Sequence, residues 1–281
     1  MYRMTLCLGT GPSFGVSTEE QIKLFRQAGF EAFFTDWNEN VAAYRKLADE
    51  LGMIYQSVHA PFSKAAALWQ EGEAAEQAVA ELLRCVDDCA ENGVPILIVH
   101  PYIGFDGPYL PTETGLKNFG AVVNAARQKG VKIAFENVEG EEYLAALMEA
   151  FADYENVGFC WDTGHEQCYN YGKDMLSLYG DRLIATHIND NLGVSRADGT
   201  IHWTDDLHLL PFDGVNDWDD VAARLCRHGY DGILTFELKR NSNPGRHDAD
   251  KYAALPVEQY VAEAYARACR LAVKLEHLRR G

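Results

Sequence analysis

Two hydrophobic patterns alternate along the chain. Short runs rich in β-branched and aromatic residues, such as VKIAFE and ILTFE, are separated by longer segments in which apolar residues recur every three or four positions. The first pattern predicts buried strands and the second predicts amphipathic helices. Eight strands are expected, ending near Thr10, Asp36, His59, His100, Glu136, Asp162, His187 and Glu237.

Predicted helices fill the intervals between these strands. Ser17, with Glu20 three residues later, predicts a capped start for a helix that ends near Ala28. The other helices are expected over 41–51, 74–92, 114–129, 141–151, 218–228 and 257–279. Five helices are followed by a glycine and then a strand, at Gly29, Gly52, Gly93, Gly130 and Gly229. Repeated helix–glycine–strand units predict parallel strands with helical crossovers. Eight such strands predict an α/β fold: a single (β/α)8 TIM barrel, forming one domain over residues 1–281.

Length, charge and cysteine content limit the class of protein that this chain can be. The 281 residues suffice for one large barrel, and the net charge of -17 disfavours nucleic acid as a partner because a strongly acidic surface repels phosphate. The N-terminal run MYRMTLCLGT lacks the pattern of a secretion signal, and no apolar run is long enough to span a membrane. The seven cysteines are scattered without a C-x-x-C pair, which is typical of reduced thiols. Together these features predict a cytoplasmic protein without a membrane partner.

Residues of metal-ligand type end the last four predicted strands, at Glu136, Asp162, His187 and Glu237. In a parallel barrel such positions converge on one mouth. A carboxylate at a barrel rim is also commonly salt-bridged, but four such residues on consecutive strands favour a metal site. Two glutamates, one aspartate and one histidine suit Mn²⁺, Co²⁺, Zn²⁺ or Mg²⁺.

Further polar residues lie close to this set in sequence. His59 and His100 end the third and fourth strands, where each could bind metal, contact substrate or lie in the core, and His165 follows Asp162 by three residues. Asp206 and His208 are spaced to be either additional metal ligands or a hydrogen-bonded pair, and we favour the pair. Asp190 is a candidate to support a metal ligand, and Lys239 a candidate to pair with a carboxylate.

Other motifs carry less information. The segment GTGPSFG lacks the Lys-Ser/Thr of a phosphate-binding loop. Residues 191–231 form a long insertion that is expected to overhang the mouth and contact substrate. Four aromatic residues are candidates for the walls of a sugar pocket, although aromatic residues in this fold more often lie in the core: Trp37, Trp161, Phe105 and Trp203.

The order of the motifs FEN, WDTGH, THIND and TFELK resembles that of the xylose isomerase-like TIM barrels, over nearly the whole chain. That superfamily includes sugar phosphate isomerases/epimerases, ketose 3-epimerases, hydroxypyruvate isomerase, inosose dehydratase and endonuclease IV. The resemblance to the epimerase branch implies one divalent metal ion held by Glu136, Asp162, His187 and Glu237. It further implies that Glu136 and Glu237 are the acid/base catalysts and that His165 contacts substrate; we extend the substrate-binding expectation to His59, His100 and His208. The segment HLLPFDG is similar to the family's H-x-x-P-G-x-G loop, with Phe212 where glycine is common.

The resemblance to endonuclease IV implies a different ligand set, that of a trinuclear zinc site. Its ligand types match His59, His100, Glu136, Asp162, His165, His187, Asp206, His208 and Glu237. The acidic charge and the lack of basic loops argue against a DNA substrate.

The predicted activity is therefore a metal-dependent isomerase/epimerase of carbohydrate metabolism. It would move a proton next to the carbonyl of a sugar or sugar-like hydroxy-ketone through a metal-stabilised enediolate. The alternatives are an inosose-dehydratase-like lyase and an endonuclease IV-like zinc phosphodiesterase. The basic residues near the mouth, Arg196, Lys239, Arg240 and Arg246, form no evident cluster, which favours an unphosphorylated small carbohydrate. Relatives commonly form dimers or tetramers, so a homo-oligomer is a further expectation.

Overall fold

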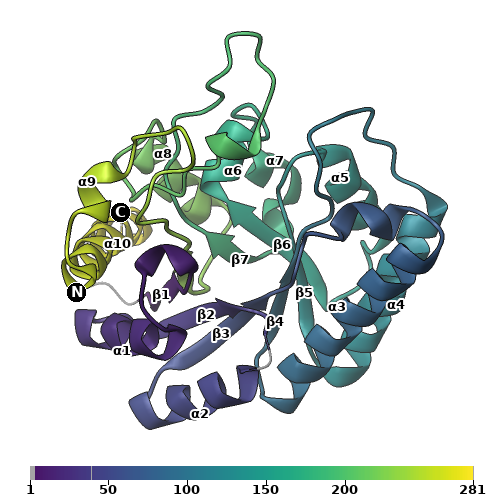
Figure 1. The fold of residues 1–281 in the computed structure, drawn as a ribbon, viewed down its shortest axis with the longest axis horizontal. Coiled ribbons are helices and arrows are strands. Elements are labelled where there is room, and N and C mark those ends of the chain that lie inside the picture. Colours follow the sequence, from purple (N-terminus) through teal and green to yellow (C-terminus); the bar gives the residue numbers. More distant parts are fainter. Residues whose placement is uncertain (1–3, 39, 281) are drawn as a thin grey trace.

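The computed structural model describes residues 4–38 and 40–280. Within them, eight parallel strands form a sheet in the order β7-β6-β5-β4-β3-β2-β1-β8 (Figure 1). The sheet closes on itself, because Ile188, directly after β7, donates from its backbone N–H to the Thr235 carbonyl at 2.8 Å. The strands are β1 (Leu6–Gly9), β2 (Ala32–Asp36), β3 (Ile54–His59), β4 (Ile96–Val99), β5 (Lys132–Glu136), β6 (Val157–Asp162), β7 (Leu183–His187) and β8 (Leu234–Phe236). This confirms the predicted (β/α)8 barrel, and every predicted strand end is within one residue of the observed one.

The major helices also follow the sequence pattern. They are α1 (Thr18–Ala28), α2 (Val41–Leu51), α3 (Glu73–Glu91), α4 (Glu113–Lys129), α5 (Glu141–Ala150), α8 (Trp218–Arg227) and α10 (Val257–Arg280). Ser17 caps α1 as expected, since its hydroxyl accepts from the Glu20 N–H. All five glycines that follow helices have positive φ. Three short helices are not evident from the pattern: α6 (Thr163–Cys168), α7 (Met175–Tyr179) and α9 (Asp250–Ala253).

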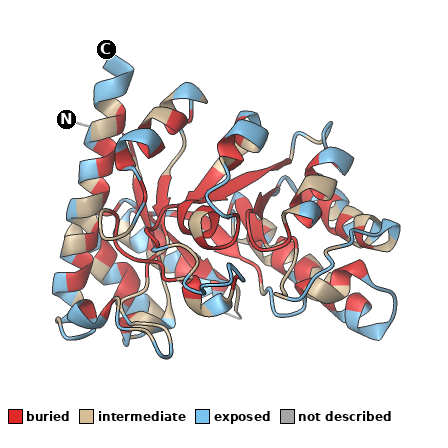
Figure 2. Cartoon of the chain, turned by 90° about the horizontal axis from the view of Figure 1, so that it is seen from above, coloured by how far each residue is buried: buried red, intermediate tan, exposed pale blue. Residues whose placement is uncertain are grey.

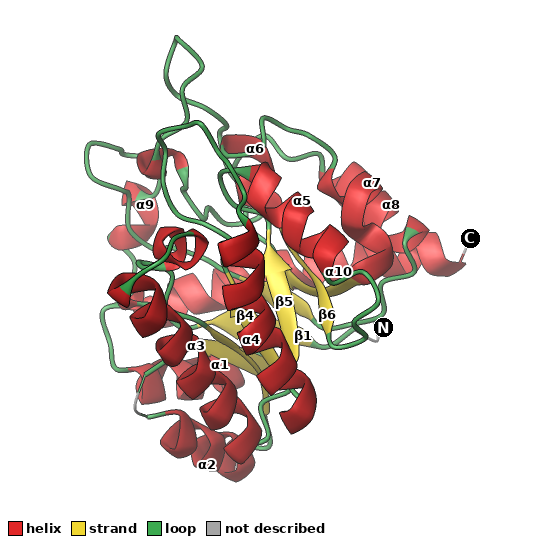
Figure 3. Cartoon of the chain, turned by 90° about the vertical axis from the view of Figure 1, so that its right-hand side faces the viewer, coloured by secondary structure: helices red, strands yellow, loops and turns green. Residues whose placement is uncertain are grey.

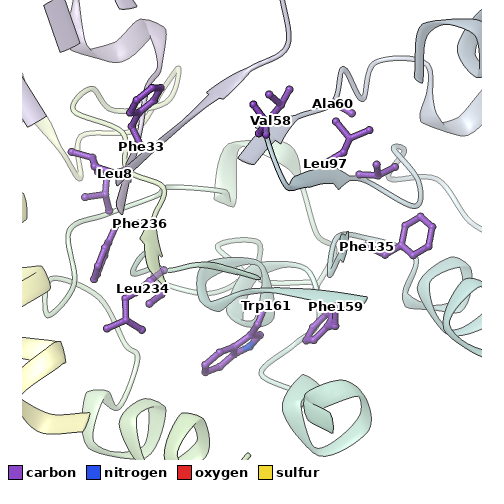
Figure 4. Close-up of a cluster of buried hydrophobic side chains, with 14 of the residues drawn as sticks. Leu8, Phe33, Val58, Ala60, Leu97, Phe135, Phe159, Trp161, Leu234 and Phe236 are labelled. Atoms are coloured by element: carbon purple, nitrogen blue, oxygen red, sulfur yellow. The ribbon is translucent and has the colours of Figure 1, made fainter. Parts of the chain in front are cut away.

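The apolar core has two layers. The larger one lies between strands and helices, and strand side chains such as Leu97, Phe135 and Phe159 contribute to it (Figure 4). A smaller layer lies inside the barrel and uses the alternate strand positions, including Ile98, Ala134 and Cys160. The strands are buried on both faces, whereas the outer faces of the helices are exposed (Figure 2).

Because all strands are parallel, their carboxyl ends share one mouth. The long connection from β7 to α8 rises above the barrel as the green loop at the top of Figure 1, and long loops gather at one end of the strands in Figure 3. No helix among the described residues is long and apolar enough to cross a membrane.

Candidate metal and active site

A cavity of about 520 Å³ lies at the mouth of the barrel. Its floor and walls come from strand ends and from the loops that follow β1, β7 and β8. The four histidines expected to bind substrate, His59, His100, His165 and His208, all line it. Glu237 and Asp206 line it as well, whereas the fully buried Glu136 lies beneath. Strand ends, the start of α6 and the loop after β7 therefore bring the predicted site residues to one place.

The four predicted metal ligands form one compact cluster. Ligand atoms of Glu136, Asp162, His187 and Glu237 all lie within 4.8 Å of one another. His187 Nδ1 is 3.1 Å from Glu136 Oε1 and 3.0 Å from Glu237 Oε2. Donors bound to one tetrahedral ion at zinc-ligand distances lie roughly 3.3–3.4 Å apart, so these donors are spaced closely enough to share an ion.

Two asparagines hold Asp162 in place. Asn189 Nδ2 donates to Asp162 Oδ2 at 2.8 Å, and the Asn137 side chain bonds both the backbone N–H and the carbonyl of Asp162. Asp162 Oδ1 accepts the His165 backbone N–H at 2.6 Å and thereby caps α6. Burial raises the pKa of Asp162 to about 6, against the lowering effect of the His165 imidazole. Such outer contacts orient a metal ligand.

A second group of donors surrounds the other oxygen of Glu136. His59 Nε2 and His100 Nε2 each lie 3.4 Å from Glu136 Oε2, and the two nitrogens are 3.2 Å apart. Glu136 Oε2 accepts no hydrogen bond from any described residue, although it is fully buried. Burial lowers the pKa of His100 to about 4, which fits the requirement that two facing nitrogens cannot both carry a proton.

The third group contains His165, Asp206 and His208. His165 Nε2 lies 3.4 Å from Asp206 Oδ1, and His208 Nε2 lies 2.7 Å from Asp206 Oδ2. Burial opposes the charge of Asp206, but His208, Lys239 and His165 outweigh it and hold the pKa of this carboxyl well below its usual range. The favoured Asp206–His208 pair is present, and it also faces the cavity as a potential metal-binding group. Lys239 pairs with Asp206 at 3.2 Å, as expected for a carboxylate partner.

In the cluster of the four predicted metal ligands, His187 offsets the negative charge of the glutamates. Burial alone would lower the pKa of His187, but the carboxylates of Glu136 and Glu237 outweigh it and raise the pKa well above its usual value. In turn His187 is the main favourable charge beside Glu237, whose pKa is lowered despite burial. A divalent cation could take the same position between these carboxylates.

Asp190 anchors the long loop that delivers Asp206 and His208. Its backbone pairs with Leu209 in an isolated antiparallel bridge, with both N–H···O distances at 2.9 Å. Its fully buried carboxylate accepts bonds from Asn191, Asn216 and Trp218. Asp190 thus supports the site by fixing the loop and does not touch the donor clusters through any hydrogen bond seen in the described residues.

Some expectations about the pocket need correction. None of Trp37, Trp161, Phe105 and Trp203 lines the central cavity. Trp161 is in the outer core layer, where its indole donates to Glu166, and Trp37 donates to Asp88. Among the phenylalanine, tyrosine and tryptophan side chains that the structure describes, Phe62 lines the cavity.

Sequence reasoning also missed several site residues. Asn137 and Asn189 stand directly after Glu136 and two residues after His187, and their amide positions could have suggested a supporting role. The cavity is also lined by Gly9 to Ser13, in the GTGPSFG segment that was noted but not assigned to the site, and by Asn241, Ser242 and Asn243, which have no distinguishing motif.

Comparisons with known proteins agree with this architecture. Residues 22–264 match the family described as Xylose isomerase-like TIM barrel. The chain is 31% identical to the uncharacterized protein y4fM of Sinorhizobium fredii, covering 88% of this chain and 90% of that protein. Two solved structures share the fold: the IOLI protein with a bound zinc atom (17% identity, TM-score 0.72, covering 97% and 98% of the two chains) and an L-ribulose 3-epimerase (16% identity, TM-score 0.71, covering 99% and 96%). The chain belongs to the Xylose isomerase-like TIM barrel family.

Proposed function

We propose that this protein is a divalent-metal-dependent isomerase or epimerase of a sugar or sugar-like hydroxy-ketone. The observation that carries the proposal is the pair of carboxylates, Glu136 and Glu237, that converge on His187 Nδ1 from strands separated by two others. Proton transfer next to a carbonyl needs carboxylates held beside the reacting carbon. The L-ribulose 3-epimerase similar in fold is consistent with such chemistry.

The donor set fits a divalent ion. Glu136, Asp162, His187 and Glu237 would hold it, and these oxygen and imidazole donors suit Mn²⁺, Co²⁺, Zn²⁺ or Mg²⁺. A bound ion would polarise the substrate carbonyl and favour the charge that develops on its oxygen. The zinc atom in the IOLI structure supports this assignment.

The two glutamates differ in access, which suggests different roles. The Glu237 side chain is 27% exposed and lines the cavity, so it can take a proton directly from a bound substrate. Glu136 is fully buried, and its Oε1 lies within 3.3 Å of both His165 and His187. We assign the first proton transfer to Glu237, whereas Glu136 would hold the ion and is the candidate for the second transfer.

The cavity suits an uncharged substrate. Lys239 pairs with Asp206, and Arg246 pairs with Asp205 and Asp248. The Arg240 guanidinium donates to backbone carbonyls, including those of Tyr252 and Phe14. With these three basic side chains engaged in this way, the mouth favours a substrate without phosphate, which the histidines and asparagines would bind through hydroxyl groups.

The test is turnover on a panel of ketoses in deuterated water, with Mn²⁺, Co²⁺ or Zn²⁺ supplied. An epimer that carries solvent deuterium at the reacting carbon is the expected product. Glu237→Gln should lower turnover by about 10²–10⁴-fold, whereas the exposed control Glu149→Gln should not. Near-normal activity of Glu237→Gln would refute the assignment, and a new conjugated chromophore would identify the dehydratase reaction instead.

One observation favours a second candidate, a zinc phosphodiesterase. Nine donor residues, counting His100, gather in three groups that could each hold an ion. The net charge of -17 argues against DNA binding. Elemental analysis separates the two: about one ion per chain supports the epimerase, whereas three zinc ions together with nicking of an abasic duplex would establish the nuclease.

A further inference from the structure

A second cavity opens on the β4 to β7 side of the mouth. It has a volume of about 550 Å³, within the range of small-molecule sites. The loops after these four strands build its wall, and the proposed reaction uses none of it. Four aromatic side chains dominate the lining: Phe105, Tyr109, Tyr169 and Tyr171.

Tyr169 lies between this second cavity and the central one. Its ring stacks on His165 with centroids 4.8 Å apart, and it also contacts the Phe105 ring at 5.6 Å. His165 lines the central cavity and Tyr169 lines the second cavity. Two stacked rings, one lining each cavity, therefore lie between the cavities, which places the second cavity next to the proposed reaction site.

Tyr171 lies in the turn that follows α6, where the Gly172 N–H donates to the Glu166 carbonyl at 2.7 Å and the Lys173 N–H donates to the Asn170 carbonyl at 3.0 Å. Its φ of 56° lies in the left-handed region, which costs a residue with a side chain roughly 1–2 kcal/mol. Its side chain is nevertheless 65% exposed, so little burial offsets this cost. Strained residues concentrate at ligand sites, where the bound ligand uses the geometry.

The opposite wall is closely packed. Tyr109 contacts the rings of Tyr102 and Tyr143, which stack at 4.2 Å, and the Leu110 N–H donates to the Tyr143 hydroxyl. Gly140 permits this packing, because a Cβ there would lie 3.1 Å from the Tyr109 ring. The aromatic surface is thus formed before any ligand binds, which limits the entropy lost on binding.

The polar rim is mixed, with one more carboxylate than ammonium group. Lys173 is paired with Glu141 at 2.8 Å, whereas the exposed Glu142 makes no ion pair within the part of the chain that the structure describes. An engaged lysine beside two carboxylates offers little to an anion. A neutral polyhydroxylated ring suits the cavity, since the aromatic faces can pack on its C–H groups while the rim bonds its hydroxyls.

We propose that the second cavity is an outer subsite for a pyranose ring linked to the reacting sugar, so that the substrate is a glycoside or disaccharide. The role of the reacting ring rests on the proposed function, but binding of the outer ring does not depend on catalysis. Tyr171 and Phe105 are the residues that would recognise the outer ring.

The test is ligand-observed NMR titration of the full chain with cellobiose, maltose and lactose, and with glucose for comparison. At least one disaccharide should bind more tightly than glucose. Tyr171→Ala and Phe105→Ala should each weaken that binding about threefold to tenfold, the size expected for one aromatic contact. Val273→Ala, which alters an exposed apolar residue on α10, should not change it.

Failure of this proposal is distinguishable from failure of the proposed function. Disaccharide binding that depends on Tyr171, together with full activity of Glu237→Gln, would retain the subsite and refute the assigned chemistry. Absence of disaccharide binding, or equal binding by both aromatic variants and wild type, would overturn the subsite. Displacement of the disaccharide by choline would overturn it as well, because the cavity would then be a cation site formed by aromatic faces and Glu142.

Discussion

Replacement of Asp190 by asparagine should loosen the loop that carries the third donor group. The carboxylate accepts the Asn191 and Asn216 N–H groups at 3.0 and 3.1 Å on Oδ1, and the Trp218 indole N–H at 3.0 Å on Oδ2. Asparagine preserves one oxygen for the two backbone donors. Its amide NH₂ would then face the Trp218 N–H, so two donors would oppose each other in a fully buried place.

The expected loss of stability is a sum of two effects. A buried donor without an acceptor costs about 1–3 kcal/mol, and the two remaining bonds lose the assistance of a charged acceptor. Together these changes should lower the free energy of unfolding by about 2–4 kcal/mol, a large part of the 5–15 kcal/mol typical of a domain. Because Asp190 pairs with Leu209, the loosened loop should also carry Asp206 and His208 away from the cavity.

Urea unfolding of Asp190→Asn, Trp218→Phe and the double variant measures this effect. Trp218→Phe removes the indole donor, so the double variant should lose less than the sum of the single variants. The second readout is the rise in melting temperature on adding Zn²⁺ or Mn²⁺, which should be smaller in Asp190→Asn. If the free energy of unfolding of Asp190→Asn lies within about 0.5 kcal/mol of the wild-type value, the hydrogen bonds to the Asp190 carboxylate do not contribute to stability as we expect.

Three further experiments test other parts of the structure. Gly214→Ala should lower the free energy of unfolding by about 1–3 kcal/mol, because its Cβ would lie 2.2 Å from the Asn191 carbonyl oxygen. Gly120→Ala, inside α4, should instead raise the free energy of unfolding by about 0.5–1 kcal/mol, since its Cβ meets only Phe151 at 3.8 Å. Equal effects of the two substitutions in denaturant titrations would contradict both predictions. Arg224→Met should lower the free energy of unfolding by about 3–5 kcal/mol, because it leaves the buried Glu166 without its arginine partner. This loss, measured by urea unfolding, should become smaller at lower pH, because burial raises the pKa of Glu166 and the folded state favours the protonated carboxyl as the pH falls toward that pKa. Chelator treatment should lower the melting temperature and Mn²⁺, Co²⁺ or Zn²⁺ should restore it, with a smaller response in Asp162→Asn; an unchanged melting temperature throughout would refute metal binding.

The barrel could be predicted from the sequence because its signals are local. Each strand is a short apolar run that ends at a polar residue, and helix ends are marked by glycines such as Gly29 and Gly52 with positive φ. Parallel strands bring their ends together, so the convergence of Glu136, Asp162 and His187 followed from the topology alone. The donor clusters therefore depend on few long-range details.

The parts that were missed depend on side-chain direction. Trp161 immediately precedes Asp162, and successive strand residues face opposite sides, so an inward Asp162 requires an outward Trp161. The outward direction of Trp161 could therefore have been predicted from the alternation of strand residues alone. The second cavity could not be predicted in this way. Tyr109 and Tyr171 belong to loops whose approach to each other depends on packing across the mouth, and this approach has no periodic signal in the sequence.

The charge at the mouth is compatible with bound cations, whatever the relatives bind. Glu136, Asp162, Asp206 and Glu237 bring four carboxylates together, and Lys239 is the permanent cation paired with one of them. Imidazoles can supply part of the missing charge only if they are protonated. The 3.2 Å approach of the His59 and His100 nitrogens prevents both from carrying a proton there, so at most one of these two contributes a positive charge in this way. Divalent ions between these donors would neutralise the carboxylates and leave the imidazoles neutral, which is the protonation state in which histidine binds metal.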